Sequence, residues 1–240
     1  MFLMAALWLS CVTACAGPSN RITDYLVGFE PPASHQHIIL PLVVGLVIAL
    51  PEQELGKPTT PSLAAFEGLA QRIQKELEES PLLKVGRVFP AFVIPAAGHA
   101  ALSLERLRMR AADPALSQII VVVPTSQGAR KVRFGGVEDQ LFARMDAGLL
   151  DLATGRVLAG DTGQDDYVLA QSNFYNSFSY PRLYYRTFTF AGPFTVVTGD
   201  PFKALGITAF SGAADQIGMK LRQLVDPTPQ ARAAMTETSS

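Results

Sequence analysis

The sequence predicts an α/β fold of the α+β kind, in which helices pack on a mixed β-sheet. Three observations predict this class. Runs rich in Ile, Val and Phe alternate with segments whose apolar residues recur at helical spacing, which gives a βαβαβ start. Two later segments of alternating polarity flank a turn, which predicts a β-hairpin. Apolar residues near the C-terminus recur every three or four positions, which predicts a closing helix.

The βαβαβ start is predicted from the spacing of its apolar residues. Its first strand is nearly unbroken in Ile, Leu and Val and is bounded by Pro51, which is typical of a strand buried on both faces. The segment Thr-Thr-Pro-Ser at 59–62 offers an N-cap and an early Pro before apolar residues at helical spacing, and Ser103 precedes a second such set, so we expect a helix after each. The predicted order is a strand at 38–50, a helix at 63–77, a strand at 82–94, a helix at 103–111 and a strand at 118–123.

The predicted hairpin centres on a turn at residues 151–156. Before the turn, residues 141–150 place Leu, Ala and Met on one face and Phe, Arg and Asp on the other. Within it, Asp151 can accept backbone hydrogen bonds and Gly155 can take a positive φ, before Val157 begins the return strand. The closing helix is expected over residues 203–225, because the Asp-Pro pair that follows ends a helix.

The first fifteen residues predict an export signal that ends at a lipid-attachment site. Residues 2–9 form an apolar run too short to span a bilayer, and small residues follow it, although no Lys or Arg opens it. The tetrapeptide Val-Thr-Ala-Cys ending at Cys15 resembles a bacterial lipobox, whereas the residues before Cys11 fit poorly. We expect a signal peptide at 1–14 and acylation of Cys15, which attaches the chain to a membrane through lipid such as palmitate. The alternative is a buried apolar segment of a cytosolic protein.

The residues after Cys15 indicate which membrane is involved and how the chain is laid out. In lipoproteins of this kind an Asp directly after the Cys retains the protein in the inner membrane. Here Ala16 and Gly17 follow, which favours the outer membrane, with the chain on its periplasmic face. We expect a lipid-anchored spacer at 15–37, a single α/β periplasmic domain at 38–226 with an aromatic-rich insertion at about 165–200, and a disordered tail at 227–240.

Composition excludes several classes of protein. With 48% hydrophobic and 17% charged residues, the chain is too apolar for intrinsic disorder. Its net charge of -1 provides no basic footprint for nucleic acid, and its dispersed Lys and Arg argue against a polybasic membrane patch. Both cysteines, Cys11 and Cys15, lie in the leader, so we expect no disulfide in the mature chain.

The sequence offers little catalytic chemistry. Its three His residues lack Cys, Asp or Glu at ligand spacing, and no cofactor-binding motif is present, so we expect no metal, no cofactor and no enzyme. The one enzymatic hint is the Asp-Thr-Gly tripeptide at Asp161, which surrounds the carboxylate of aspartic proteases. That chemistry needs two carboxylates, and only one such tripeptide occurs. We interpret Asp161 as a polar residue in a turn that closes a hairpin.

Aromatic residues concentrate between positions 174 and 194. Residues 183–191 alternate, which predicts a strand with Tyr184 and Phe188 on one side and Tyr185 on the other. One interpretation is a strand that contributes to the core. A second is a partner-binding surface formed by Tyr180, Tyr184, Tyr185 and Phe188, since exposed aromatic residues concentrate binding energy. A third is a membrane-inserting hairpin of a ring, although polar interruptions fit poorly with such strands.

The order of these features resembles a group of bacterial lipoproteins. The candidate acylated Cys, the segment Arg-Ile-Thr-Asp-Tyr-Leu at 21–26, the apolar first strand with its helix and second strand, and the turn at 151–156 together resemble the rhombotarget lipoproteins. They resemble more distantly the group that contains the curli-secretion lipoprotein and the penicillin-binding-protein activator lipoproteins. The likeness covers residues 15–163 and the closing helix, but the chain ends without the glycine-rich sorting tail of the first family.

The resemblance implies an α/β periplasmic domain that binds other proteins or assembles with itself, without chemistry of its own. We therefore expect a lipid-anchored accessory protein of the cell envelope with unidentified envelope partners. The principal alternative is a homo-oligomeric subunit of an outer-membrane export pore. A hydrolase that uses Asp161 comes third.

Overall fold

The computed structural model describes residues 20–30, 40–95, 102–111, 116–133, 136–172, 184–186, 195–196 and 201–225. The side chains of residues 130–139 and 169–205 are not part of this description. The predicted signal peptide at 1–14, the lipidation site Cys15 and the predicted tail at 227–240 therefore lie outside the described residues.

The helices and strands follow the predicted order. The helical segments are α2 (Ile22–Tyr25), the short 3-10 helix η2 (Glu52–Glu54), α3 (Leu63–Glu78), α4 (Leu104–Arg110) and α5 (Pro201–Val225). The strands are β1 (Leu26–Val27), β2 (Leu42–Pro51), β3 (Leu83–Val88), β4 (Phe92–Ile94), β5 (Leu102–Ser103), β6 (Gln118–Arg133), β7 (Gly136–Asp151), β8 (Arg156–Ser172), β9 (Tyr184–Arg186) and β10 (Thr195–Val196). Ser103 caps α4, and within the segment 59–62 it is Ser62 that caps α3; each accepts a hydrogen bond from a backbone N–H three residues on.

The large sheet is mixed. Its strands lie in the order β10-β9-β8-β7-β6-β2-β3, and β4 also pairs with β2. β2 runs parallel to β3, β4 and β6, whereas the pairs from β6 to β10 are antiparallel. The predicted α+β class, βαβαβ start, hairpin and closing helix are thus confirmed.

The strand predicted at 82–94 is two strands, β3 and β4. Both pair with β2 in parallel, β3 along Leu42–Leu46 and β4 along its last three residues, so they follow one another beside the same strand. Pro90 lies in the break between them. Because proline cannot donate a backbone hydrogen bond, a continuous ladder through this position is unfavourable.

Two hydrophobic layers bury both faces of the central strands. On one face, α3 and α5 pack against alternate residues of β2, β6 and β7, and Phe66 of α3 meets Phe210 of α5 edge to face. The alternation predicted for residues 141–150 is confirmed, because its apolar members lie in this layer and are buried. Val122 of β6 is also buried here.

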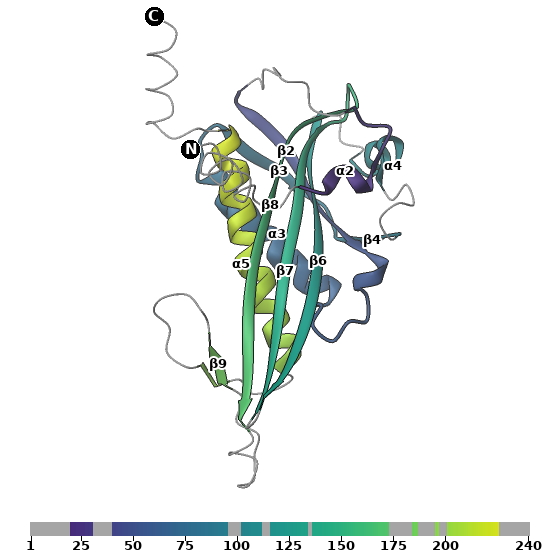
Figure 1. Cartoon of the computed structure of the whole chain (residues 1–240). Coiled ribbons are helices and arrows are strands. Elements are labelled where there is room, and N and C mark those ends of the chain that lie inside the picture. The colour runs from purple at the N-terminus through teal and green to yellow at the C-terminus, as the bar shows by residue number, and fades with distance from the viewer. Residues whose placement is uncertain are drawn as a thin grey trace, which may run out of the picture.

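On the other face, α2 and α4 cover the half of the sheet nearest the β7–β8 turn (Figure 1). Ile22 and Tyr25 of α2 are buried there, and β1 pairs in parallel with β5, immediately before α4. Residues 20–30 belong to the stretch 15–37 that the sequence suggested as a spacer. Residues 20–30 pack on the sheet because packing removes the apolar surface of Ile22 and Tyr25 from water.

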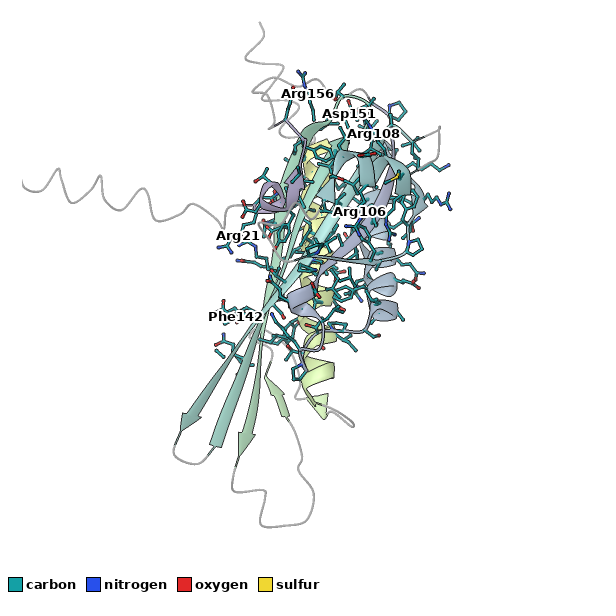
Figure 2. All side chains as sticks on the ribbon, turned by 90° about the vertical axis from the view of Figure 1, so that its right-hand side faces the viewer. Arg21, Arg106, Arg108, Phe142, Asp151 and Arg156 are labelled. Atoms are coloured by element: carbon teal, nitrogen blue, oxygen red, sulfur yellow. The ribbon has the colours of Figure 1, made fainter. Side chains whose placement is uncertain are left out.

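The three longest strands, β6, β7 and β8, form two consecutive hairpins. Figure 2 shows their far ends projecting beyond the helices. The predicted turn between β7 and β8 is confirmed: Asp151 Oδ1 accepts a hydrogen bond from Ala153 N at 2.8 Å, and Gly155 has φ +73°. The β6–β7 hairpin was not predicted, since β6 continues ten residues beyond the apolar run that ends at Val123.

Candidate functional site

A polar hollow of about 920 Å³ lies beside α2, where the helical cover of the sheet ends. Its wall includes Arg21 and Tyr25 from the N-terminal segment, Lys57 from the loop after η2, and Phe142 and Arg144 from β7. Figure 2 shows Arg21 and Phe142 on the same side of the sheet. Phe142 is 43% exposed, so an apolar ring stands in an otherwise polar wall. The hollow has the volume of a ligand site, but its lining is mainly polar and includes two buried carboxylates.

The first of these carboxylates, Asp146, is 1% exposed and fully engaged. Arg144 donates to both of its oxygens at 2.8 Å from Nε and Nη2, which is the bidentate geometry of a strong ion pair. Thr162 Oγ1 on β8 donates at 2.6 Å, and the backbone N–H of Arg21 donates at 3.2 Å. Beside it, Asn20 Nδ2 donates to the carbonyl of Ala147 at 2.8 Å. Asp146 therefore fastens the N-terminal segment to the sheet.

The second carboxylate, Glu54, is 2% exposed and closes an edge of the sheet. β2 pairs with β6 only as far as Val122, so the outer edge of β6 is uncovered from there on among the described strands. Glu54 Oε2 accepts from the backbone N–H of Ser126 at 3.1 Å and from its hydroxyl at 2.7 Å. Lys57 Nζ bonds Glu54 at 2.7 Å and the Ser126 carbonyl at 3.0 Å. At Ser126, Glu54 and Lys57 therefore bond the backbone N–H and carbonyl that a neighbouring strand would otherwise bond.

Tyr25 lies close to both networks. Burial raises the pKa of its phenol, and the negative charges of Asp146 and Glu54 raise it further. The hydrogen bonds to Asp146 raise the pKa of the Arg144 guanidinium in the same network. Tyr25 therefore stays neutral and Arg144 stays charged near pH 7, so neither group is prepared to exchange a proton in acid–base catalysis.

The candidate catalytic carboxylate Asp161 lies within β8, paired with Ala147, and its predicted place in a turn is wrong. The structure explains each residue of the tripeptide without catalysis. Asp161 faces Lys220 of α5 at 3.4 Å, with both side chains about a third exposed. Thr162 is buried on Asp146, and a Cβ on Gly163 would come within 2.7 Å of Ile217 N in α5. The glycine permits α5 to approach the sheet closely.

A third acidic group lies where β8 meets α5. Burial raises the pKa of the Asp165 carboxyl above its ordinary value, and the nearby charge of Asp166 adds to the rise, although a hydrogen bond from the Asp166 backbone opposes it. Burial also raises the pKa of Tyr167, and its charged neighbour Asp165 raises it further. On α5, Asp215 forms a two-bond ion pair with Arg72 of α3, at 2.9 and 2.6 Å. The Arg72–Asp215 pair thus joins α3 to α5 beside these strand residues.

The residues proposed from the sequence as sites are only partly described. Cys15, Tyr180 and Phe188 lie outside the described residues. Tyr184 and Tyr185 belong to β9, where their backbones pair with Ala170 and Leu169 of β8 and with Val196 and Thr195 of β10. Sequence reasoning missed Asp146 and Glu54 as buried groups. The sequence carried only a weak signal of this burial. Asp146 occupies the polar face of a correctly predicted strand, and the segment that covers it, around Arg21, is distant in sequence.

Among the described residues, no group of three or more His, Cys, Asp or Glu side chains has an arrangement that could hold a metal ion. No helix in the described part of the chain combines the length and apolar character needed to cross a membrane.

Comparison with known proteins yields distant structural likenesses only. No family model matches the chain, and no curated protein matches it. A PelC dodecamer subunit from Paraburkholderia phytofirmans is similar at 10% identity and a TM-score of 0.37, over 77% of this chain and 94% of that one. Protein CT253 from Chlamydia trachomatis is 13% identical with a TM-score of 0.38, over 78% and 100% of the two chains. Lipoprotein GNA1162 from Neisseria meningitidis is 13% identical with a TM-score of 0.29, over 52% and 83%. At these values the likenesses assign no family to the chain.

Proposed function

We propose that this protein is a lipid-anchored accessory protein of the bacterial cell envelope, which binds other proteins and catalyses no reaction itself. The observation that carries the proposal is the apolar run at 2–9 followed by the lipobox-like tetrapeptide ending at Cys15. Several acyl chains on one Cys bury many CH₂ groups, so such an anchor is stable without a membrane-spanning helix. The residues that follow Cys15 favour the outer membrane and its periplasmic face.

The polar groups of the sheet support the non-catalytic part of the proposal. Asp146 is bonded to Arg144, Thr162 and the Arg21 backbone, and Glu54 is bonded to Lys57 and Ser126. A general base needs a free lone pair aimed at substrate and a pKa suited to the reaction. The oxygens of both carboxylates accept hydrogen bonds from the protein's own backbone and side chains, which favours a structural role.

Partner binding is proposed for the aromatic region. Tyr180, Tyr184, Tyr185 and Phe188 supply the residue types that dominate interface energetics. Their segment adds β9 and β10 to the β8 side of the sheet, so an aromatic interface there would adjoin the rigid antiparallel strands.

The anchor is tested by labelling cells with a palmitate analogue. Cys15→Ala should abolish label incorporation and release the protein from the membrane fraction, because the acyl acceptor is lost. Cys11→Ala is the matched control and should leave labelling and fractionation unchanged, since its upstream residues do not fit the lipobox. Equal labelling of both variants would overturn the proposal.

Self-assembly is a second candidate function, favoured by the exposed edge of β6. Beyond Val122 this edge has no strand partner among the described residues, and only Ser126 is covered by the Glu54–Lys57 pair. A strand of a second copy could pair there, and repeated pairing could close a ring of the kind that an export-pore subunit requires. The mass of the detergent-solubilised protein distinguishes the two proposals: a monomer or small oligomer favours the accessory role, and a large closed ring favours the pore.

A further inference from the structure

The face of the domain that carries α4 is rich in exposed arginine. Arg106, Arg108 and Arg110 are exposed on α4, whose only acidic residue is Glu105, so this helix carries a net charge of 3 − 1 = +2. Arg87 of β3 is also exposed on this side of the sheet. We call Arg87, Arg106, Arg108 and Arg110 the arginine face. Figure 2 shows Arg106 and Arg108 on the α4 side of the molecule.

Aromatic rings hold three of these guanidinium groups in place. The Arg110 guanidinium carbon lies 3.9 Å from the centroid of the Phe92 ring, and that of Arg106 lies 5.7 Å from the same ring. Arg87 lies 5.2 Å from the Phe89 centroid. A ring attracts a cation without neutralising its charge, so these contacts orient the arginines and leave them able to attract anions.

Three charges of this face, those of Arg87, Arg108 and Arg110, are not paired with a carboxylate among the described residues. Arg108 donates to the backbone carbonyls of Leu152 and Ala153 at 2.6 and 2.9 Å, which removes no net charge. Among the described residues, no carboxylate forms an ion pair with Arg87 or Arg110. On the α3–α5 face, by contrast, three basic side chains have carboxylate partners, in the pairs Arg72–Asp215, Lys220–Asp161 and Arg222–Glu79.

The candidate lipid anchor joins the domain close to this face. Asn20 is bonded to Ala147 on the α2–α4 side of the sheet, and only residues 16–19 separate it from Cys15. Five residue steps of fully extended chain span at most about 18 Å. From Asn20 the chain continues through α2 to β1, which pairs with β5 directly before α4. A short tether therefore keeps the α2–α4 side of the sheet near the bilayer surface.

An apolar side chain stands within the arginine face. Met109 of α4 is 67% exposed, between Arg108 and Arg110 in sequence. Basic residues around an exposed apolar side chain form the pattern that binds the headgroup region of a membrane, where the charges meet phosphates and the apolar group enters the boundary of the acyl chains.

From charge, tether length and exposure together we infer that the arginine face docks on anionic phospholipid headgroups of the membrane that holds Cys15. This inference rests on the proposed lipid anchor. It assigns an orientation to the anchored domain: α4 faces the lipid, and α3 and α5 face the periplasm. It differs from the expectation, based on the dispersed Lys and Arg of the sequence, that the chain has no polybasic membrane patch.

The test uses the full-length acylated protein reconstituted in vesicles. The mature chain has no cysteine other than Cys15, so Met109→Cys and Gln71→Cys each introduce one free thiol for an environment-sensitive fluorophore, the first on α4 and the second on the exposed surface of α3. In vesicles of phosphatidylcholine with phosphatidylglycerol, the probe at 109 should shift its emission to the blue and the probe at 71 should not. The shift should disappear in pure phosphatidylcholine and at high salt, because screening lengths fall below about 5 Å near 0.5 M.

A charge reversal provides the matched comparison. Arg110→Glu changes the charge near the lipid by two units, so the ratio of docked to undocked protein should fall about 25-fold, at about fivefold per charge. Lys75→Glu makes the same change on exposed α3 and should leave the ratio unaltered. Thermal melts check that both variants remain folded.

The outcomes separate the inference from the anchor on which it rests. Protein that floats with the vesicles but shows equal spectra at 109 and 71 overturns the docking alone. Protein that fails to float overturns the anchor, and the docking with it. A blue shift at 109 that depends on phosphatidylglycerol and is lost in Arg110→Glu but not in Lys75→Glu supports the inference.

Discussion

Asp146 shows how a single carboxylate can hold three parts of the chain together. It lies on β7, accepts a hydrogen bond from Thr162 on β8, and bonds the Arg21 backbone, 125 residues away in sequence. Burying a carboxylate is costly unless its oxygens accept hydrogen bonds. This explains why Arg144 donates to both oxygens of Asp146 and why Thr162 and the Arg21 backbone donate as well. The same requirement explains the partners of Glu54 at the edge of β6.

We expect Asp146→Asn to destabilise the fold by about 2–4 kcal/mol, because it leaves the largely buried Arg144 charge without its counterion. The midpoint of urea unfolding measures the loss. Asp166→Asn is the matched control, since Asp166 is exposed and its carboxylate bonds only the Gln140 side chain among the interactions described. Its effect should stay within about 0.5 kcal/mol. Equal effects of the two substitutions would contradict the fastening role of Asp146.

The raised pKa of Asp165 predicts a pH-dependent effect on stability. A carboxyl whose folded pKa exceeds its unfolded pKa favours folding when protonated, so its contribution is present below the unfolded pKa and is lost as pH rises through the folded pKa. Asp165→Asn removes this titration. The variant should therefore melt slightly higher than the wild type at pH 7, and the difference should shrink as the pH is lowered below the ordinary Asp range. A difference that grows on acidification would show that the sign is wrong.

At the scale of elements, α5 depends on close contact with β8. Gly163 of β8 lies beneath Ala213 and Ile217 of α5, and there is no room between them for a side chain. Ala213 and Ile217 are themselves buried in the layer between the sheet and α3. The position of α5 is thus determined jointly by small residues at the contact and by apolar burial.

Two glycine substitutions should have opposite effects on stability. Gly163→Ala places a Cβ within 2.7 Å of Ile217 N, and backbone atoms cannot rotate away, so we expect a loss of about 3 kcal/mol. Gly68→Ala lies within α3, where an added Cβ meets nothing within 4 Å, and should gain about 0.5–1 kcal/mol through helix propensity. Thermal and urea unfolding compare them. A neutral Gly163→Ala would mean that α5 packs differently.

At the scale of the whole molecule, the aromatic region contributes β9, which extends the large sheet beside β8. The backbone of Tyr184 lies between Ala170 of β8 and Val196 of β10, so the sheet continues into this region. The core, interface and membrane interpretations remain distinct predictions, because each assigns the rings to a different environment.

Tyr184→Ser and Phe188→Ser in a soluble form beginning at Ser19 distinguish these interpretations. If the rings fill the core, Phe188→Ser should destabilise the protein by about 3–5 kcal/mol, as for a large buried aromatic residue. An unchanged melting temperature with loss of captured partners would instead assign the rings to an interface. Binding of the wild-type soluble form to liposomes, reduced in both variants, would assign them to the membrane. Thermal unfolding, pull-down and vesicle flotation are the three measurements.

The sequence predicted those elements whose conformation depends on residues close together in the chain. The caps at Ser62 and Ser103, the turn at 151–156 and the alternation of 141–150 depend on residues within a few positions of one another. The second half of β6 was missed for the converse reason. Its polar, glycine-containing residues show no strand periodicity, and their conformation comes from pairing with β7, continuous from Gln118 to Arg133. The break between β3 and β4 likewise depends on which residues of β2 each strand meets.

By itself the sequence determined the α+β class, the βαβαβ order, the β7–β8 turn and the closing helix, because periodicity, caps and turn residues are properties of neighbouring positions. Only the tertiary structure decided that Asp146 and Glu54 are buried, that Asp161 lies within a strand and pairs with Lys220, and that Arg87 lies over the Phe89 ring. Burial and electrostatic environment depend on segments that meet across the fold. Asn20 and Ala147, which are 127 residues apart and joined by one hydrogen bond, exemplify contacts that no local pattern records.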